Sequence, residues 1–132
     1  MKKKIYIGCA LTHAPEEFRI AISELKDKLR QDYEILDFIG LEKGTAEDVF
    51  EWDTKCVRSC DLLVADCTHP AIGLGIEIGV AIENNKPMLL VAHKDAKIGR
   101  MILGITHPKF SFHRYNDSLE VVTFIKERIR TL

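Results

Sequence analysis

The sequence lacks the marks of several large classes of protein. No apolar stretch approaches the roughly 20 residues needed to span a bilayer. Neither sign of charge dominates, because 19 basic and 20 acidic side chains give a formal net charge of −1. Such a chain has no general field that would attract a nucleic-acid polymer or an anionic membrane. We therefore expect neither as a partner, and a ligand must be recognised by a local site.

The cysteines are not arranged in the close pairs typical of metal-binding or redox sites. None of the four cysteines forms a Cys-x-x-Cys pair. Cys56 and Cys60, one helical turn apart, leave open a metal site with Cys67 and His69, although structural zinc sites usually use tighter pairs. The basic start Met-Lys-Lys-Lys precedes a short apolar run containing a glycine, which favours a first strand over a secretory signal. We therefore expect a cytoplasmic protein with reduced, mostly buried thiols and no metal.

Short apolar runs alternate with amphipathic segments along the whole chain, which predicts strands alternating with helices. The expected strands are residues 4–10, 33–38, 61–65, 87–92 and 110–113. The expected helices are residues 16–30, 46–59, 73–84, 98–103 and 118–130. The pattern predicts one α/β domain over residues 1–132, with a flavodoxin-like, doubly wound parallel sheet of five strands in the order 2-1-3-4-5.

The segment from Ile72 to Ile82 is ambiguous. Its apolar residues alternate strictly, which on periodicity alone indicates a strand. Three glycines would weaken a strand, however, and Pro87 already opens another apolar run. A strand here would also remove the crossover helix that parallel neighbours require. We therefore predict a helix.

In an open parallel sheet, ligands bind outside the carboxyl ends of the strands, where the strand order reverses. For the order 2-1-3-4-5 this point lies between the first and third strands, beside residues 9–13 and 66–77. The run from Gly73 through Gly75 to Gly79 differs from a dinucleotide fingerprint, because its third glycine comes one residue late and it opens the third crossover helix. It predicts a glycine-lined turn at a helix N-terminus, which favours an anion over a nicotinamide cofactor.

Two carboxylates point to chemistry at this edge. Glu77 falls near the start of the glycine-rich helix, where it could also merely complement the helix dipole. Asp53 lies within the apolar arc of its own helix, a costly place for a carboxylate unless backbone amides bind it. Two carboxyl groups in different environments are the minimum equipment for glycosidic chemistry, since one attacks or stays ionised while the other carries a proton. We expect both to face one pocket at the carboxyl ends of the first and third strands.

Other side chains are expected near this pair. The Tyr6 hydroxyl needs a partner if it is buried, and a carboxylate at a neighbouring strand end would serve, although aromatic residues are common in strands. Asp66 ends the third strand and could line the site. Thr12 and His13 could meet a phosphate or sugar, with a solvated loop as the alternative. Trp52 is expected in the core rather than as a base-stacking platform.

These residues carry a resemblance to a known family. The segment Asp53 to Gly79 contains a leading Asp, an Ala-Asp strand end, Thr-x-Pro and Gly-x-Gly-x-Glu-x-Gly at the same spacing, without gaps. It resembles the signature of the nucleoside 2-deoxyribosyltransferase family, especially its 2′-deoxynucleoside 5′-phosphate N-hydrolase branch. The opening Lys-Ile-Tyr-Ile-Gly is also similar to the start of these proteins.

The resemblance implies a flavodoxin-like fold and a homo-oligomer built from dimers, with the partner subunit helping to close each site. It implies that Glu77 attacks the anomeric carbon and forms a glycosyl-enzyme intermediate. Asp53 would assist departure of the base or position the sugar, and Tyr6 would orient Glu77. Water resolving the intermediate gives hydrolysis, and a second nucleobase gives base exchange. No metal or organic cofactor is implied.

One position departs from the family pattern. Six residues before the glutamate, the transferases typically carry an Asp for the sugar 5′-hydroxyl and the monophosphate hydrolases a Ser for phosphate, whereas this chain has Ala71. An alanine does not repel phosphate, and Arg100 with Thr12 could supply donors to an anion. The residues expected to bind the substrate are Cys9, Thr12, Asp66, Ala71, Gly73, Gly75 and Arg100.

The resulting hypothesis is an N-glycosidase that acts on a nucleoside 5′-monophosphate, with a 2′-deoxy sugar favoured. The nearest alternative is a deoxyribosyltransferase that exchanges bases on free deoxynucleosides. A second alternative is a non-catalytic nucleotide-binding or signalling domain, although a binder would gain little from burying two carboxylates beside a neutral sugar.

Overall fold

The computed structural model describes residues 1–132, which form one five-stranded sheet flanked by helices. The strands are β1 (Lys4–Cys9), β2 (Glu34–Leu36), β3 (Leu62–Asp66), β4 (Met88–His93) and β5 (Phe110–Tyr115). The helices are α1 (Glu16–Leu29), α2 (Ala46–Ser59), α3 (Ile72–Glu83), α4 (Arg100–Leu103) and α5 (Glu120–Ile129). All strand pairs are parallel and the order is β2-β1-β3-β4-β5. The predicted fold class and strand order are therefore confirmed.

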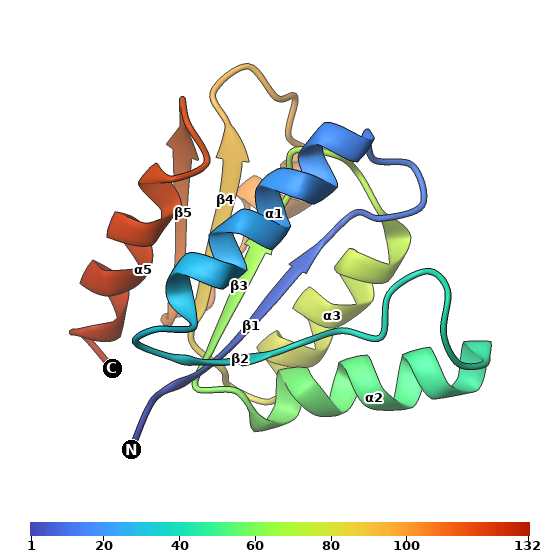
Figure 1. The fold of residues 1–132 in the computed structure, drawn as a ribbon. Coiled ribbons are helices and arrows are strands. Elements are labelled where there is room, and N and C mark those ends of the chain that lie inside the picture. The colour runs from blue at the N-terminus through green and yellow to red at the C-terminus, as the bar shows by residue number, and fades with distance from the viewer.

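The sheet is covered on both faces, so the molecule has two hydrophobic cores. Helices α1 and α5 pack on one face, and α2 and α3 pack against each other on the opposite face (Figure 1). On the first face, Ile5, Ile7 and Val64 pack with side chains of α1 and α5. On the second, Tyr6 and Leu63 pack with side chains of α2 and α3. Alternate residues of each strand thus serve opposite cores, as expected in a doubly wound sheet.

Helix α3 confirms the choice of a helix for the ambiguous segment. Its buried residues are Leu74, Glu77, Ile78 and Ala81, which follow the three- and four-residue spacing of one helical face. The alternating apolar residues do not share one buried face, as they would in a strand, because Ile72 is left 88% exposed. The crossover between the parallel strands β3 and β4 requires a helix here, and this topological demand outweighs the local alternation.

Helix α2 begins at a capping box and carries Asp53 on its inner side. The Thr45 side chain accepts a hydrogen bond from Asp48 N, and the Asp48 side chain accepts one from Thr45 N. This exchange satisfies two of the free amides of the first turn and fixes where the helix starts. The expectation of a buried Trp52 is wrong, because its side chain is 45% exposed and its Nε1 donates to Asp37 O at 2.8 Å.

Two further expectations concern the thiols and the membrane. All four cysteines are free and buried, as expected. No helix combines the length and apolar character needed to cross a bilayer.

Candidate active site

A cleft of about 780 Å³ opens at the carboxyl ends of β1 and β3. Its walls come from β1 and the loop that follows it, the loop after β2, the inner face of α2 and the first half of α3. This is the edge of the sheet at which the strand arrowheads of β1 and β3 lie in Figure 1. The strand order reverses here, because β1 lies between β2 on one side and β3 on the other, and the later strands continue on the side of β3. The cleft therefore occupies the position at which α/β sheets bind ligands.

Glu77 is the most unusual side chain of the cleft. It is 9% exposed, and its Oε2 accepts a hydrogen bond from the Tyr6 hydroxyl. Burial raises the pKa of Glu77 from 4.5 to about 7, although the Tyr6 hydrogen bond acts in the opposite direction. The carboxyl is thus a buried acid that titrates near neutral pH, which is the property expected of a functional group rather than of a structural one.

Tyr6 and Gly8 on β1 shape the space around this carboxyl. Tyr6 is fully buried, and burial together with the Glu77 charge raises the pKa of its phenol, so it remains a hydrogen-bond donor. A Cβ atom at Gly8 would lie 2.9 Å from Glu77 Oε1 and 3.0 Å from Leu74 Cδ1. Only glycine lets helix α3 bring the carboxylate this close to the strand. One oxygen of Glu77 is therefore held by Tyr6 while the other lies over Gly8.

Asp53, on α2, lines the same cleft. It is partly buried, and its Oδ1 accepts a hydrogen bond from Ile39 N at 3.1 Å. Burial raises the pKa of Asp53, whereas the Ile39 amide and the charge of Lys26 lower it. The structure thus brings both carboxyl groups into one cleft, and it also gives Asp53 a backbone partner. A carboxylate bound by a backbone amide and a carboxylate facing a cleft are therefore both correct descriptions of Asp53.

Four of the expected substrate-binding residues line the cleft with this pair, namely Cys9, Thr12, Ala71 and Gly73. His13 lies there too, whereas Gly75 does not, although its neighbours Leu74 and Ile76 do.

The structure does not place Asp66 in the cleft. Its side chain accepts hydrogen bonds from Thr68 Oγ1 at 2.6 Å and from the Tyr115 hydroxyl at 2.7 Å. Strand residues alternate between faces, and Ala65 faces the core of α2 and α3. Asp66 consequently points toward the opposite face, where Tyr115 belongs to the core of α1 and α5.

Arg100 is also outside the cleft. It is exposed and begins the short helix α4, after β4. Because β4 lies beyond β3 in the strand order, this helix is separated from β1 by the width of a strand. Arg100 does not line the cleft of the single chain, and its expected contact with an anion stays a prediction.

Two neighbours of the cleft were not expected from the sequence. Phe38 lies in the loop after β2, and Lys26 on α1 packs its ammonium 3.6 Å from the centre of the Phe38 ring. A signal for Lys26 was present, because it falls among Ile22, Leu25 and Leu29 on the buried face of its helix. Like Asp53, Lys26 could therefore be recognised as a charged residue within the apolar face of its helix.

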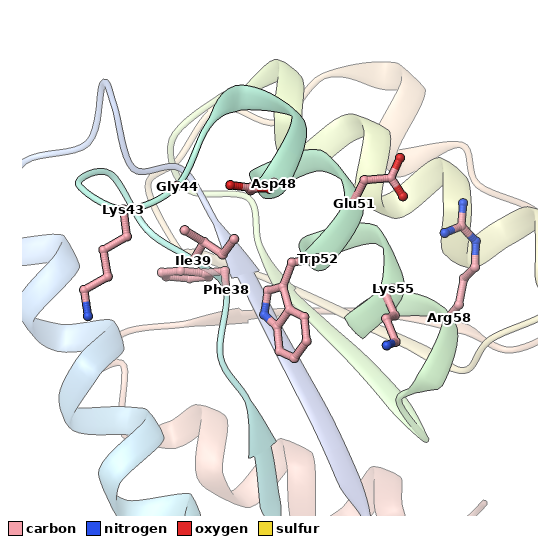
Figure 2. Close-up of a pocket in the computed structure, with 9 residues that line it drawn as sticks. All are labelled: Phe38, Ile39, Lys43, Gly44, Asp48, Glu51, Trp52, Lys55 and Arg58. Atoms are coloured by element: carbon pink, nitrogen blue, oxygen red, sulfur yellow. The ribbon is translucent and has the colours of Figure 1, made fainter.

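A second hollow, of about 860 Å³, lies beside the outer face of α2 (Figure 2). Figure 2 shows Trp52, Glu51 and Lys55 projecting from the helix, with Phe38 across from them. It shares only Phe38 with the cleft and contains neither Glu77 nor Asp53. Its charged side chains are exposed, with Lys43 in the loop before α2 and the others on the helix, as on an ordinary solvated surface. The cleft with the buried carboxyl is therefore the candidate active site.

A flavodoxin-like strand order with a paired-carboxylate cleft at its switch point defines the class, an α/β protein with an enzyme-like site. The chain belongs to the nucleoside 2-deoxyribosyltransferase family, whose model matches residues 5–114. It is therefore an enzyme of this family, as expected from the resemblance of its motifs.

Individual relatives agree with this placement. A protein of Syntrophotalea carbinolica named "Putative 2'-deoxynucleoside 5'-phosphate N-hydrolase 1" is 33% identical over 114 residues, which are 86% of this chain and 76% of the relative. A protein of the same name from Thermofilum pendens is 34% identical over 89 residues, 65% of this chain, and the match spans only 62% of that relative's length. The structure of the Clostridium botulinum CMP N-glycosidase superposes with a TM-score of 0.73 at 20% identity, over 94% of this chain and 99% of that one. This last likeness shows a common fold.

Proposed function

We propose that this chain cleaves the N-glycosidic bond of a 2′-deoxynucleoside 5′-monophosphate and releases the free base. The observation that carries the proposal is the buried Glu77, held by the Tyr6 hydroxyl in a cleft that also contains Asp53. The names of the Syntrophotalea and Thermofilum relatives give the same bond and the same class of substrate. The CMP N-glycosidase of the same fold acts on a nucleotide as well.

In the proposed reaction the ionised Glu77 is the nucleophile. Its Oε1, the oxygen not engaged by Tyr6, forms a bond to the anomeric carbon, while the electron pair of the N-glycosidic bond goes to the departing base. Asp53, whose pKa is raised by burial, supplies a proton to the base. Asp53 then accepts a proton from water, which attacks the anomeric carbon and releases Glu77. The net result is hydrolysis, and both carboxyl groups return to their starting states.

The phosphate of the substrate is best accommodated at the start of α3. Ala71 is the N-cap and makes no side-chain hydrogen bond, and the first turn carries no acidic residue. Ala71 and Gly73 both line the cleft, so free amides of this turn are available to an anion without steric or charge opposition. Thr12 lies on the same cleft and offers a hydroxyl. These features support a monophosphate over a free nucleoside.

Deoxyribosyl transfer between bases is the alternative that the family keeps open. It shares the first half of the mechanism and differs in the acceptor, which is a second nucleobase instead of water. A carboxylate at position 71 would favour a free 5′-hydroxyl, and the alanine found there does not supply it. A non-catalytic nucleotide-binding domain is disfavoured by the cost of keeping Glu77 buried beside a neutral sugar.

The test is a panel of nucleosides and their 5′-monophosphates, incubated with the protein in the presence and absence of an acceptor base and separated by chromatography. We expect free base and deoxyribose 5-phosphate from monophosphates, no dependence on the acceptor, and no product with Glu77→Ala. Faster turnover of free nucleosides, with exchanged nucleosides as products, would establish the transferase instead. Ordinary turnover by a folded Glu77→Ala protein would overturn the mechanism.

We also propose that the chain works as a homo-oligomer whose partner subunit covers part of the cleft. Four apolar side chains that line the cleft are unusually exposed in the single chain: Ile72 at 88%, Leu41 at 56%, Phe50 at 52% and Ile76 at 47%. Exposed apolar groups that border one cavity are typical of a surface that a partner or ligand covers. Light scattering after size-exclusion chromatography tests this, and a mass of one 15.0 kDa chain at all concentrations would contradict it.

A further inference from the structure

Lys26 is a buried cation whose hydrogen-bonding capacity is not used by the protein. It lies on α1 and is only 6% exposed. An ammonium has three N–H donors, yet Lys26 Nζ makes no hydrogen bond, and its ion-pair partner Asp37 Oδ1 is 3.8 Å away. Its other neighbour is the Phe38 ring, 3.6 Å from Nζ to the ring centre. No fully buried side-chain nitrogen or oxygen lacks a hydrogen-bond partner in this structure, so the Nζ atom of Lys26 is not sealed off and can reach water or a ligand.

The cavity beside Lys26 adjoins the active-site cleft. It measures about 450 Å³ and lies between α1 and the loop after β2. The residues that line both the cavity and the cleft are Cys9, Leu11, Phe38, Gly40 and Leu41. This shared wall contains an aromatic ring and apolar side chains, whereas the rest of the cavity is also lined by charged groups, namely Arg19, Lys26, Arg30, Asp37, Glu42 and Lys43. Arg19 donates to backbone carbonyls and Arg30 pairs with Asp37, so Lys26 is the buried cation of this lining without a hydrogen bond. A flat ligand group can pack on the shared wall and present a hydrogen-bond acceptor to Lys26.

The position of the cavity identifies which part of the substrate would enter it. Glu77 Oε1 lies over Gly8 at the sheet, and the start of α3 offers amides to the proposed phosphate. The group left for the cavity beside α1 is the nucleobase. Lys26 is also close enough for its charge to be felt at both Asp53 and Glu77, whose pKa values it lowers.

We propose that Lys26 binds the departing base, donating a hydrogen bond from its ammonium to an exocyclic carbonyl oxygen. This rests on the proposed function and deepens it, because it names the substrate class: nucleotides whose base carries an exocyclic oxygen, such as uracil, cytosine or hypoxanthine, over adenine, which carries none.

The chemistry follows from the charge that develops on the base. When the bond to the anomeric carbon breaks, its electron pair passes to the base nitrogen and is delocalised onto the exocyclic oxygen. A preformed ammonium facing that oxygen stabilises the developing charge, and the stabilisation is stronger away from bulk water. Burial lowers the pKa of Lys26, and the charge of Asp37 acts in the opposite direction. In the proposed step Lys26 stays protonated, and the base nitrogen receives its proton from Asp53. The Lys26–Phe38 contact also holds the ring on the shared wall, against which the base can pack.

The test compares Lys26→Met, which keeps a long unbranched side chain and removes the charge, with Lys28→Met on the same helix. Lys28 is exposed and lines neither the cavity nor the cleft, so it reproduces the loss of charge alone. Kinetics are measured with 2′-deoxyuridine, 2′-deoxyinosine and 2′-deoxyadenosine 5′-monophosphates. We expect Lys26→Met to lower kcat/KM for the first two by about 10- to 100-fold, the size expected for a hydrogen bond to a charged group, and to change the adenine substrate by less than threefold. Lys28→Met should leave all three within twofold.

A binding measurement separates a failure of this inference from a failure of the proposed reaction. Hypoxanthine, adenine and deoxyribose 5-phosphate are titrated by calorimetry into the wild type and Lys26→Met. We expect hypoxanthine alone to lose at least tenfold in affinity. Equal losses for hypoxanthine and adenine would show that Lys26 only holds Phe38, and unchanged hypoxanthine affinity would overturn the inference, whether or not the wild type cleaves nucleotides. Circular dichroism of both variants confirms folding.

Discussion

Replacing Glu77 by Gln should stabilise the protein at alkaline pH and not at acid pH. The folded state holds the Glu77 proton up to pH about 7, whereas the unfolded chain releases it near 4.5. Between these values the folded state binds more protons than the unfolded state, so the free energy of unfolding falls as pH rises through this window. At about 1.4 kcal/mol per pKa unit, the loss amounts to about 3 kcal/mol in total. A glutamine does not titrate and still offers Tyr6 an oxygen acceptor, so the variant should escape the loss.

The assay is urea unfolding of the wild type and Glu77→Gln between pH 4 and pH 8. The difference in unfolding free energy isolates Glu77, because the other titrating groups are common to both proteins. We expect this difference to grow by about 3 kcal/mol in favour of Glu77→Gln across the range. Glu83→Gln, an exposed change on the same helix, is the matched control and should give a flat difference within about 0.5 kcal/mol. A curve for Glu77→Gln as flat as that control would refute the reasoning that burial raises this pKa.

Three other substitutions test the surroundings of Glu77. Tyr6→Phe removes the hydrogen-bond donor of Glu77, so kcat should fall about 10- to 100-fold. Without that bond the pKa of Glu77 rises, so the increase of kcat/KM with pH should move above pH 7 in a pH-rate profile. An unmoved profile would contradict the contact. Gly8→Ala places a methyl group 2.9 Å from Glu77 Oε1, which should cost about 1–3 kcal/mol in thermal or urea unfolding, and unchanged stability would show that α3 shifts freely. Arg100→Ala should change kcat/KM for a monophosphate by less than twofold, because Arg100 is exposed outside the cleft. A larger loss confined to monophosphates would return Arg100 to the site.

The fold could be predicted from the sequence because the connections of a parallel sheet decided between helix and strand where the apolar periodicity was ambiguous. Buried parallel strands appear as short apolar runs, and such runs located β1, β3 and β4. At Ile72 to Glu83 the alternation favoured a strand, yet a parallel sheet needs a crossover between β3 and β4, and this requirement gave the right structure. Trp52 was misplaced because large aromatic residues are usually buried, whereas its neighbours on α2 bury the other side of that helix.

The site was predictable where a side chain violates the pattern of its own element. Asp53 could be singled out because a carboxylate on a buried helix face is costly, and Lys26 would have been found by the same test. Glu77 was found by its place near the start of the glycine-rich helix. Asp66 could not be placed in this way. Its direction depends on the register in which Cys9 pairs with Asp66, and a shift of one residue reverses the face of every side chain in a strand. The close approach at Gly8 is likewise a property of three-dimensional packing.

A pKa near 7 first looks unsuited to a nucleophile, which must be ionised. At pH 7, however, about half of the Glu77 carboxyl groups are ionised, so the cost in rate is no more than about twofold. The same burial strips water from the carboxylate and makes it more basic than an exposed glutamate, which favours attack on the anomeric carbon. Tyr6 keeps the charge from becoming prohibitively costly, and the raised pKa of Asp53 lets that residue carry the proton the base needs. The destabilisation expected from Glu77 is therefore a consequence of the environment that makes it reactive.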